Sequence, residues 1–381
     1  MTRQRTGLFA LGIVLAATTA CTPTTDRSAA PGAGASASSS ASPSEGMTTC
    51  VVERPLGPDT GAWWGVSVDP ARDSLAAYAR RLGHHPAISV DFVQIPLRRD
   101  DVRSVDAAVE AAAEQGATLL LSLEPTRGLG AVDDASVDRL VTALGRWNAA
   151  GVPVVVRYAH DMNGSWYRWG QQPVRFKASF RRVAEAVHEG APGSATMWAP
   201  AYGGGYPFTG TVSTGDDPYA PYYPGDDVVD WVGMSLYHWG NVYPWGENEV
   251  PSRGKLVSQL RGTYRGFGVD ERATPDFYAE YGARRGKPVA VAETAALYAP
   301  GNGGAAEVRV KNAWLRQVLS PSLLHRLPRL KMLNWFEWDK REQEVDGPVS
   351  WTATRPAPVR TLLREALPVW ARFGDPGRAG C

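Results

Sequence analysis

The chain has 381 residues with a formal net charge of +1, and 44% of its residues are hydrophobic. This composition is typical of a globular protein with a large core, and a near-neutral charge without a basic stripe argues against a nucleic-acid partner. The six histidines show no metal-ligand spacing, so we expect no metal and no cofactor, in a protein that we take to be a monomer.

The N-terminus has the pattern of a secretory signal. Two arginines among the first five residues precede the apolar run Leu8–Ala17, which is too short to span a bilayer as a mature helix. Small residues follow, and then Cys21. We expect residues 1–21 to be a lipoprotein signal peptide with its lipobox, so that Cys21 carries a lipid. A plain signal peptide cleaved near Ala20 is the alternative.

Residues 22–49 consist mostly of Ser, Ala, Pro, Gly and Thr. They have too little apolar surface to offset the entropy cost of folding, so we predict a disordered tether. The protein would then be extracytoplasmic, and its only contact with the cell membrane would be the N-terminal lipid. Two cysteines remain, Cys50 and Cys381, and in an oxidising compartment we expect them to form a disulfide; two free thiols are the alternative.

Residues 50–381 alternate short β-branched or apolar runs with longer segments of helical period. Eight runs are predicted as strands: Trp63–Val68, Ala87–Gln94, Thr118–Glu124, Val152–Tyr158, Ala195–Pro200, Val228–Tyr237, Pro288–Glu293 and Lys331–Trp338. Clear helical stripes begin at Leu75, Val137 and Phe176, and weaker helices are predicted at Val102–Gln115, Pro275–Arg284, Ala305–Val318 and Pro356–Leu367. This alternation predicts an α/β fold, a single (β/α)8 TIM barrel.

Fourteen tryptophans are many for a chain of this length. Because the face of a Trp ring can stack on the C–H groups of a sugar, their number indicates a carbohydrate ligand. We expect three of them, Trp147, Trp231 and Trp370, to fill the core instead.

Two carboxylates stand at the ends of predicted strands. Asp161 follows the fourth strand, and Glu293 ends the seventh. In a barrel of this type the active site lies at the carboxyl ends of the strands, so both side chains would enter the same mouth. Cleavage of a glycosidic bond needs two such groups, one to protonate the leaving oxygen and one to attack or stabilise the anomeric carbon. A salt bridge or a helix cap is the alternative for either residue alone.

Three segments resemble glycoside hydrolase family 26, the β-mannanase family. Arg157–Gly170, which reads RYAHDMNGSWYRWG, is similar to the strand-4 motif of that family. Lys287–Thr294 is similar to its strand-7 segment, which ends in the nucleophile, and Val232–Tyr237 to its strand 6. The likeness spans most of residues 61–367, although only the strand-4 motif is highly specific.

The resemblance implies roles for these residues. Glu293 would be the nucleophile, Asp161 the general acid/base, and Tyr237 the donor of a hydrogen bond to Glu293. His160, Asn163, Trp166, Trp169 and Tyr237 are also expected to bind substrate. Positions at strand ends add Tyr202, Trp335 as a floor for the sugar, and His238 with Trp239 as a sugar subsite or only a packed loop. Two further strand-end acids are open: Glu124 could bond a sugar hydroxyl, and Glu337 could be a third carboxylate in the mouth.

Asp161 departs from the family, which has Glu at this position. Its carboxyl group reaches one methylene less far, and a misplacement of ~1 Å can cost about a hundredfold in rate. Three explanations are open. The strand is shifted to compensate, the two carboxyl groups are farther apart and favour inversion through a water, or the protein has lost hydrolysis and kept binding.

The sequence therefore predicts an exported glycoside hydrolase that cleaves a polysaccharide and is endo-acting, retaining and β-mannanase-like. The alternative is a cell-surface lipoprotein that binds carbohydrate on a degenerate barrel without cleaving it. An esterase or deacetylase has no support, because neither a Gly-x-Ser-x-Gly elbow nor a metal triad is present.

Overall fold

The computed structural model describes residues 52–208, 217–241, 245–266 and 274–378. Eight parallel strands follow each other around a sheet in chain order, and β1 also pairs with β8, so the sheet closes into a barrel. The predicted (β/α)8 fold is confirmed. The barrel strands are β1 Ala62–Val68, β2 Ile88–Gln94, β3 Thr118–Glu124, β4 Val154–Tyr158, β5 Ser194–Trp198, β6 Trp231–Ser235, β7 Val289–Thr294 and β8 Leu330–Glu337.

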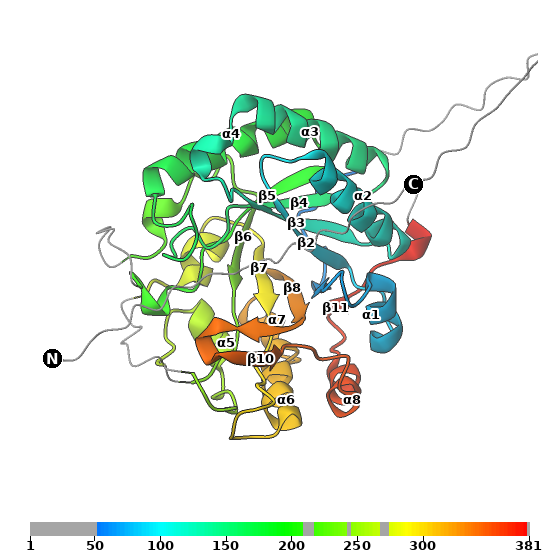
Figure 1. The fold of residues 1–381 in the computed structure, drawn as a ribbon, viewed down its shortest axis with the longest axis vertical. Coiled ribbons are helices and arrows are strands. Elements are labelled where there is room, and N and C mark those ends of the chain that lie inside the picture. Colours follow the sequence, from blue (N-terminus) through cyan, green and yellow to red (C-terminus); the bar gives the residue numbers. More distant parts are fainter. Residues whose placement is uncertain (1–51, 209–216, 242–244, 267–273, 379–381) are drawn as a thin grey trace, which may run out of the picture.

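Helices surround this barrel, with α2, α3 and α4 along one side and α6 and α8 along the other (Figure 1). Their bounds are α1 Leu75–Leu82, α2 Arg99–Glu114, α3 Asp134–Ala149, α4 Pro173–Gly190, α5 Lys255–Leu260, α6 Glu307–Val318, α7 Leu323–Arg326 and α8 Ala357–Ala366. The helix predicted at Pro275–Arg284 is a π-helix, η5 (Tyr278–Ala283). Short 3-10 turns, η2 (Gly203–Gly205) and η3 (Ala220–Tyr222), lie between β5 and β6.

Three strands of the described part were not predicted from the sequence. The strands β9 (Asp339–Glu342) and β10 (Gly347–Ser350) form an antiparallel pair directly after β8. A short strand, β11 (Ala371–Arg372), pairs in parallel with the start of β1. It adds the end of the chain to the amino-terminal end of the barrel, away from the carboxyl ends of the strands.

The helix α1 shows why these segments fold as predicted. Ser74 accepts a hydrogen bond from the backbone N–H of Ala77 and caps the first turn, and Gly83 ends the helix in the left-handed conformation at φ 85°. The predicted stripe that begins at Leu75 and ends at Leu82 is buried against the barrel. The local signals and the tertiary packing therefore agree.

Two buried layers divide the strand residues by parity. Alternate residues, among them Val90, Leu120, Val155 and Trp231, form a cluster inside the barrel. The residues between them pack outward against the helices in a larger cluster. Because side chains alternate along a strand, this parity decides which residues reach the mouth of the barrel. Trp147, Trp231 and Trp370 are buried, as expected.

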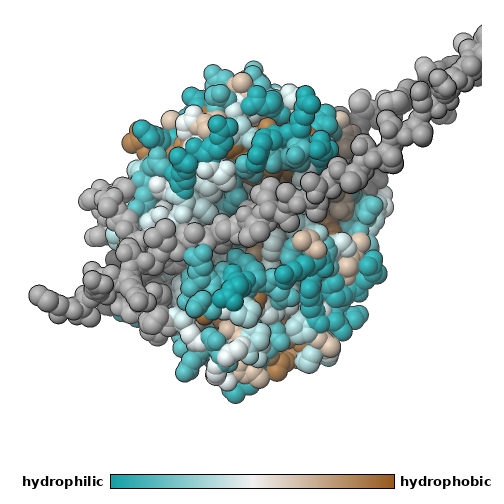
Figure 2. Space-filling model, in the orientation of Figure 1, coloured by the Kyte–Doolittle hydropathy of each residue, from teal (hydrophilic) through white to brown (hydrophobic). Residues whose placement is uncertain are grey.

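Cys21, Cys50, Cys381 and the segments predicted as signal peptide and tether lie outside the described residues. Within the described part, no helix has the length and apolar character needed to cross a membrane. Figure 2 shows that the described surface on one face is mostly hydrophilic. The large apolar side chains exposed in the described part, Leu56, Val174 and Val369, are far apart in the sequence.

Candidate active site

Glu293 lies near the end of β7 and is held by three side chains. Arg157 donates a hydrogen bond to its Oε1, Tyr237 donates to its Oε2 at 2.7 Å, and Ser235 donates to Oε1 at 3.3 Å. Burial alone would raise the pKa of Glu293, but the Arg157 guanidinium and the donated hydrogen bonds hold that pKa below its usual value. The side chain is therefore an oriented carboxylate, which suits a nucleophile.

Strict alternation would not direct Glu293 into the barrel. Ala290 and Ala292 face the interior, whereas Val289 and Val291 pack outward, so position 293 would face outward too. The pairing of β7 with both neighbouring strands is irregular at this point. Such an irregularity can redirect a side chain at the rim of a barrel, and here it brings Glu293 to Arg157.

Arg157 connects the strands below the mouth. It is fully buried on β4, and its guanidinium donates to Ser122 on β3 at 3.4 Å and to Ser235 on β6 at 2.8 Å, as well as to Glu293 on β7. A buried guanidinium needs a carboxylate partner, and Glu293 is that partner. The nucleophile candidate is thus fixed by residues from three other strands.

Asp161 lies beyond the end of β4 on an unusual backbone. Both Ala159 (φ 47°) and Asp161 (φ 54°) have left-handed conformations, and the Asp161 N–H donates to the Ala199 carbonyl at 2.9 Å. Its Oδ1 is buried without a hydrogen-bond partner among the described residues. Burial, with a smaller contribution from Glu293, raises the pKa of Asp161 to about 7, although Arg157 opposes the shift.

A third carboxyl group, Glu124, ends β3 beside these two. It is 5% exposed, and burial, together with Glu293, raises its pKa to about 7. By contrast, Glu337 at the end of β8 is not available to a substrate. Its carboxylate accepts from the backbone N–H groups of Ala353 and Thr354 and from the Thr354 hydroxyl. Glu337 therefore anchors the chain after β10, and the expectation of a carboxylate in the mouth is wrong for this residue.

His160 is buried next to the acid candidate. Burial, with the Arg157 charge, lowers its pKa to about 3, so the ring is neutral at physiological pH. It packs edge to face against Tyr167, whose ring stacks on Trp169 at 4.2 Å between centroids. Burial raises the pKa of the Tyr167 hydroxyl, and the charges of Asp161, Glu124 and Glu293 add to that shift. Sequence reasoning passed over Tyr167, although it stands inside the quoted motif.

Two motif residues, Asn163 and Trp169, form the support of this loop. The Asn163 amide donates to the Ala201 carbonyl at 2.9 Å and accepts from the Ala201 N–H at 2.8 Å. The Trp169 indole N–H donates to the His160 carbonyl at 2.8 Å. Both side chains are buried, so neither offers a surface to a sugar in this structure. We correct their expected role from substrate contact to support of His160 and Asp161.

His238 and Trp335 also lack a free surface. Trp335 is fully buried, lies beside Trp64 and donates its indole N–H to the Trp351 carbonyl at 3.0 Å. The His238 ring contacts the Glu249 carbonyl at 2.7 Å and the Lys255 Nζ at 3.2 Å. The expectation that they form a sugar floor and a subsite is not met, because the parity of their positions directs them away from the mouth.

The remaining predicted contacts, Trp166, Tyr202 and Tyr237, keep some exposed surface. Trp166 packs on Gly164, where a Cβ would lie 2.5 Å from its ring, which gives a physical reason for glycine in the motif. Trp239, which the sequence offered with His238 as a sugar subsite or a packed loop, is also partly exposed and lies 6.4 Å from Tyr237 between ring centroids. Its position two residues after Tyr237 places it on the same side of an extended chain as Tyr237.

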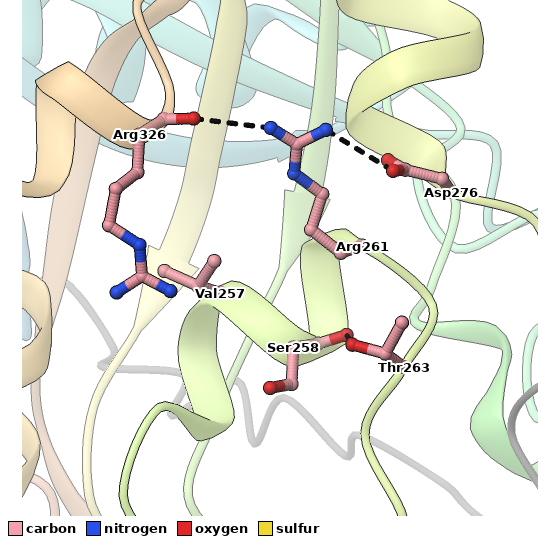
Figure 3. A pocket seen from close by; sticks show the side chains of 6 residues that line it. All are labelled: Val257, Ser258, Arg261, Thr263, Asp276 and Arg326. Carbon is pink, nitrogen blue, oxygen red and sulfur yellow. Dashed lines mark hydrogen bonds and ion pairs between the residues drawn. The ribbon is translucent and has the colours of Figure 1, made fainter.

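A separate surface pocket of about 390 Å³ lies away from these carboxyl groups. In Figure 3, Arg261 points between Asp276 and the Arg326 carbonyl and bonds to both. Arg261 follows α5, and Arg326 ends α7 just before β8 begins. Helices of this fold run back from the carboxyl ends of the strands, so this pocket belongs to the opposite end of the barrel.

No group of three or more His, Cys, Asp or Glu side chains in the described ranges is arranged to hold a metal ion. The chemistry that the site supports is that of carboxyl groups: an ionised one on β7 and a protonated one after β4, facing a partly exposed aromatic surface.

The family model described as glycosyl hydrolase family 26 matches residues 71–261. Among curated proteins, a β-1,3-xylanase of a Vibrio species is 30% identical over 198 residues, which are 48% of this chain and 39% of that protein. Endoglucanase H of Acetivibrio thermocellus is 24% identical, over 49% of this chain and 20% of that protein. The chain thus spans well under half the length of these relatives.

Solved structures show the same fold. The enzyme GH26C from a Muricauda species superimposes with a TM-score of 0.55 at 14% identity, covering 83% of this chain and 88% of that chain. An endo-β-1,4-mannanase of Cellulomonas fimi gives a TM-score of 0.53 at 16% identity, covering 82% of this chain and 72% of that chain. At this identity the likeness concerns the barrel alone.

Proposed function

The chain belongs to glycosyl hydrolase family 26, and on that premise we propose that it is an exported, lipid-anchored enzyme that cleaves a β-linked polysaccharide within the chain and retains the anomeric configuration. The observation that carries the proposal is the contrast between two carboxyl groups in one site. Glu293 is held ionised by Arg157 and Tyr237, whereas burial keeps the Asp161 carboxyl protonated up to about pH 7.

The two residues would act in sequence. Asp161 donates its proton to the glycosidic oxygen while Glu293 attacks the anomeric carbon, so that the C–O bond breaks and a glycosyl ester forms on Glu293. Asp161, now a carboxylate, takes a proton from water, and the hydroxyl oxygen attacks the same carbon and releases Glu293. Tyr237 and Arg157 keep the two oxygens of Glu293 in place throughout.

We also propose which class of polysaccharide is cleaved. The curated relatives are named β-1,3-xylanase and endoglucanase, whereas the named mannanases share the fold at 13–16% identity. Sequence similarity therefore favours a xylan or a glucan over the β-mannan that the family motif first suggested. All are neutral β-linked glycans, and the carboxyl groups of the site suit a neutral sugar.

A panel of polysaccharides tests the proposal. The purified domain would be incubated with β-1,3-xylan, mixed-linkage β-glucan and β-1,4-mannan, and the products separated by chromatography. We expect oligosaccharides of several lengths from at least one polymer, and none from the matched Glu293→Gln variant. Release of monosaccharide alone would contradict endo action.

The second candidate is a lipoprotein that binds carbohydrate without cleaving it. The observation in its favour is Asp161, which is shorter than the Glu of the family. Calorimetric binding of one of these polymers by the wild-type domain, with no products after prolonged incubation, would favour this candidate and overturn the first.

The anchor has its own test. Replacement of the proposed lipidated residue, Cys21→Ala, should move the protein from the membrane fraction to the medium. If the Cys21→Ala protein stayed in the membrane fraction, the lipid anchor would be excluded.

A further inference from the structure

Glu124 reaches the same space as the two catalytic candidates. Leu120 belongs to the cluster inside the barrel, and Ser122, two residues on, receives a hydrogen bond from Arg157. Glu124 is two residues farther along the same strand, so its side chain lies on the same inner face, at the carboxyl end of β3. It is close enough to Arg157, Glu293 and Asp161 for their charges to affect its pKa.

The side chain of Glu124 is mostly buried, and its carboxyl group has no hydrogen-bond partner among the described residues. Glu124 is 5% exposed, and only its backbone carbonyl bonds, to the N–H groups of Ile95 and Thr126. Arg157 donates no hydrogen bond to the Glu124 carboxyl group, because its guanidinium donates to Glu293, Ser235 and Ser122 instead. Buried polar groups in folded proteins normally have a hydrogen-bond partner, as Glu337 does. A missing partner at the mouth of a site points to a ligand.

The charge of the surroundings selects the protonated form of Glu124. Burial disfavours an ionised carboxylate, and the neighbouring anion Glu293 adds to that effect, which together raise the pKa of Glu124 to about 7. A protonated carboxyl group has one O–H donor and a carbonyl acceptor. A sugar hydroxyl, or two neighbouring hydroxyls, can satisfy both.

We propose that Glu124 is a third functional carboxyl group, which binds a hydroxyl of the sugar ring at the cleavage point through its protonated form. The inference rests on the proposed function, because it places a sugar between β3 and β7. Such a site would favour a neutral sugar with a free hydroxyl that points toward β3. It would disfavour acidic sugars, because their carboxylates would lie next to three carboxyl groups.

Two substitutions separate hydrogen bonding from proton transfer. Glu124→Gln keeps one donor group and one acceptor in nearly the same shape, so kcat/KM below pH 7 should stay within a few-fold of the wild type. Glu124→Leu removes both, and KM should rise about tenfold, the size expected for one hydrogen bond. Wild-type KM should also rise above pH 7 as Glu124 ionises, while the KM of Glu124→Gln stays flat.

Asp91 provides a matched control. Its pKa is also raised by burial, to about 6, but Val90 and Phe92 on either side of it belong to the inner cluster, so Asp91 faces outward from β2. When the pKa of a carboxyl group is raised in the folded state, the folded protein becomes less stable as the pH rises through that pKa. Both Glu124→Gln and Asp91→Asn should therefore raise the melting temperature at pH 8 and not at pH 5, but only Glu124→Gln should change the pH dependence of KM.

Binding assays keep this inference separate from the proposed hydrolysis. Affinities of the Glu124 variants for β-1,3-linked xylotetraose and β-1,4-linked mannotetraose would be measured by calorimetry, with every protein, the wild-type Glu124 reference included, carrying Glu293→Gln so that no turnover occurs. A Glu124→Leu protein that binds as tightly as the wild type would overturn the inference, and so would loss of turnover in Glu124→Gln, since that would assign proton transfer to Glu124. If the protein bound neither of these sugars nor a β-glucan oligosaccharide, the proposed function would fail, and an unchanged melting temperature of Glu124→Gln at pH 8 would still overturn the inference by itself.

Discussion

At the residue scale, the site depends on giving different protonation states to chemically similar groups. Glu293 has a guanidinium and a phenol as donors, whereas Asp161 has a buried Oδ1 with no donor in the described part of the chain. The first environment stabilises a negative charge, and the second disfavours it. The first environment thus suits the nucleophile and the second the proton donor that we propose, with no residue of unusual type.

The pH dependence of kcat/KM follows from these two pKa shifts. Glu293 must be ionised, and because its pKa lies below the ordinary 4.5, activity should fall only in strongly acidic solution. Asp161 must be protonated, so activity should fall as pH rises through about 7. In Asp161→Asn the alkaline limb of kcat should disappear, and only the rise of KM above pH 7 that is assigned to Glu124 should remain. The rate should fall about 10²–10⁴-fold on substrates with poor leaving groups and much less on activated aryl glycosides. An unchanged alkaline limb in Asp161→Asn would assign it to another group.

Lengthening Asp161 to the Glu of the family tests the backbone. Asp161 has φ 54°, and Asp tolerates this left-handed region better than most longer residues because its short side chain can bond locally. We therefore expect Asp161→Glu to lower both the melting temperature and kcat, with Asp161→Asn as the control that leaves the melting temperature unchanged or higher. A gain in kcat for Asp161→Glu would mean that the shorter side chain limits the natural enzyme.

At the element scale, the sequence predicted the strands well because their composition and spacing are local properties. The bounds of β3 agree at both ends with the predicted Thr118–Glu124. Side-chain direction at the strand ends could not be predicted, since it depends on register. The irregular pairing of β7 directs Glu293 inward, against its parity. Trp335 and His238 are one position away from residues that face the mouth, and a single-residue difference reverses the face.

The loop after β6 shows the same dependence. The His238 backbone pairs with the chain after β7, its N–H with the Ala295 carbonyl and its carbonyl with the Leu297 N–H, while its ring bonds to Glu249 and Lys255. Burial lowers the pKa of Lys255 to about 7. The pair therefore fixes the loop that brings Tyr237 to Glu293, and its role is structural.

Replacing His238 distinguishes this role from the sugar subsite that the sequence suggested. We expect His238→Ala to lower the free energy of unfolding by about 1–3 kcal/mol, since buried partners lose their hydrogen bonds. It should reduce kcat through Tyr237 while leaving the affinity for a tetrasaccharide unchanged. Urea unfolding and calorimetry measure the two effects. Weaker sugar binding at unchanged stability would restore the subsite.

At the scale of the whole molecule, the barrel brings together residues that are far apart in the chain. Arg157 and Glu293 are 136 positions apart and share a hydrogen bond. The order of strands could be predicted, because alternating strands and helices of this number favour one closed topology. That topology also predicted that Asp161, after β4, and Glu293, on β7, enter the same mouth of the barrel. The support of Asn163 by Ala201 could not be predicted, since it requires the positions of loops that have no repeating pattern.

The remaining prediction concerns Cys50 and Cys381, which stand at the two ends of the predicted folded domain in the sequence. A disulfide between Cys50 and Cys381 would close a very long loop and could contribute about 6 kcal/mol in the chain-entropy model. If the protein is exported as we propose, we expect no free thiol after unfolding, and a lower melting temperature in the double variant Cys50→Ser/Cys381→Ser. Two titratable thiols in the unfolded, unreduced protein would contradict the bridge.

The proposed function depends on attack of Glu293 on the anomeric carbon of the sugar and on proton transfer by Asp161. The most direct test is the mass of the Asp161→Ala protein after mixing with an activated aryl β-glycoside of the sugar that the polysaccharide panel identifies. Without the general base, the glycosyl ester should be hydrolysed slowly and accumulate. We predict a single added glycosyl group, located on the peptide that contains Glu293, and none when Glu293→Gln is combined with Asp161→Ala. An adduct on another residue, or hydrolysis with inversion of configuration and no adduct, would contradict the account.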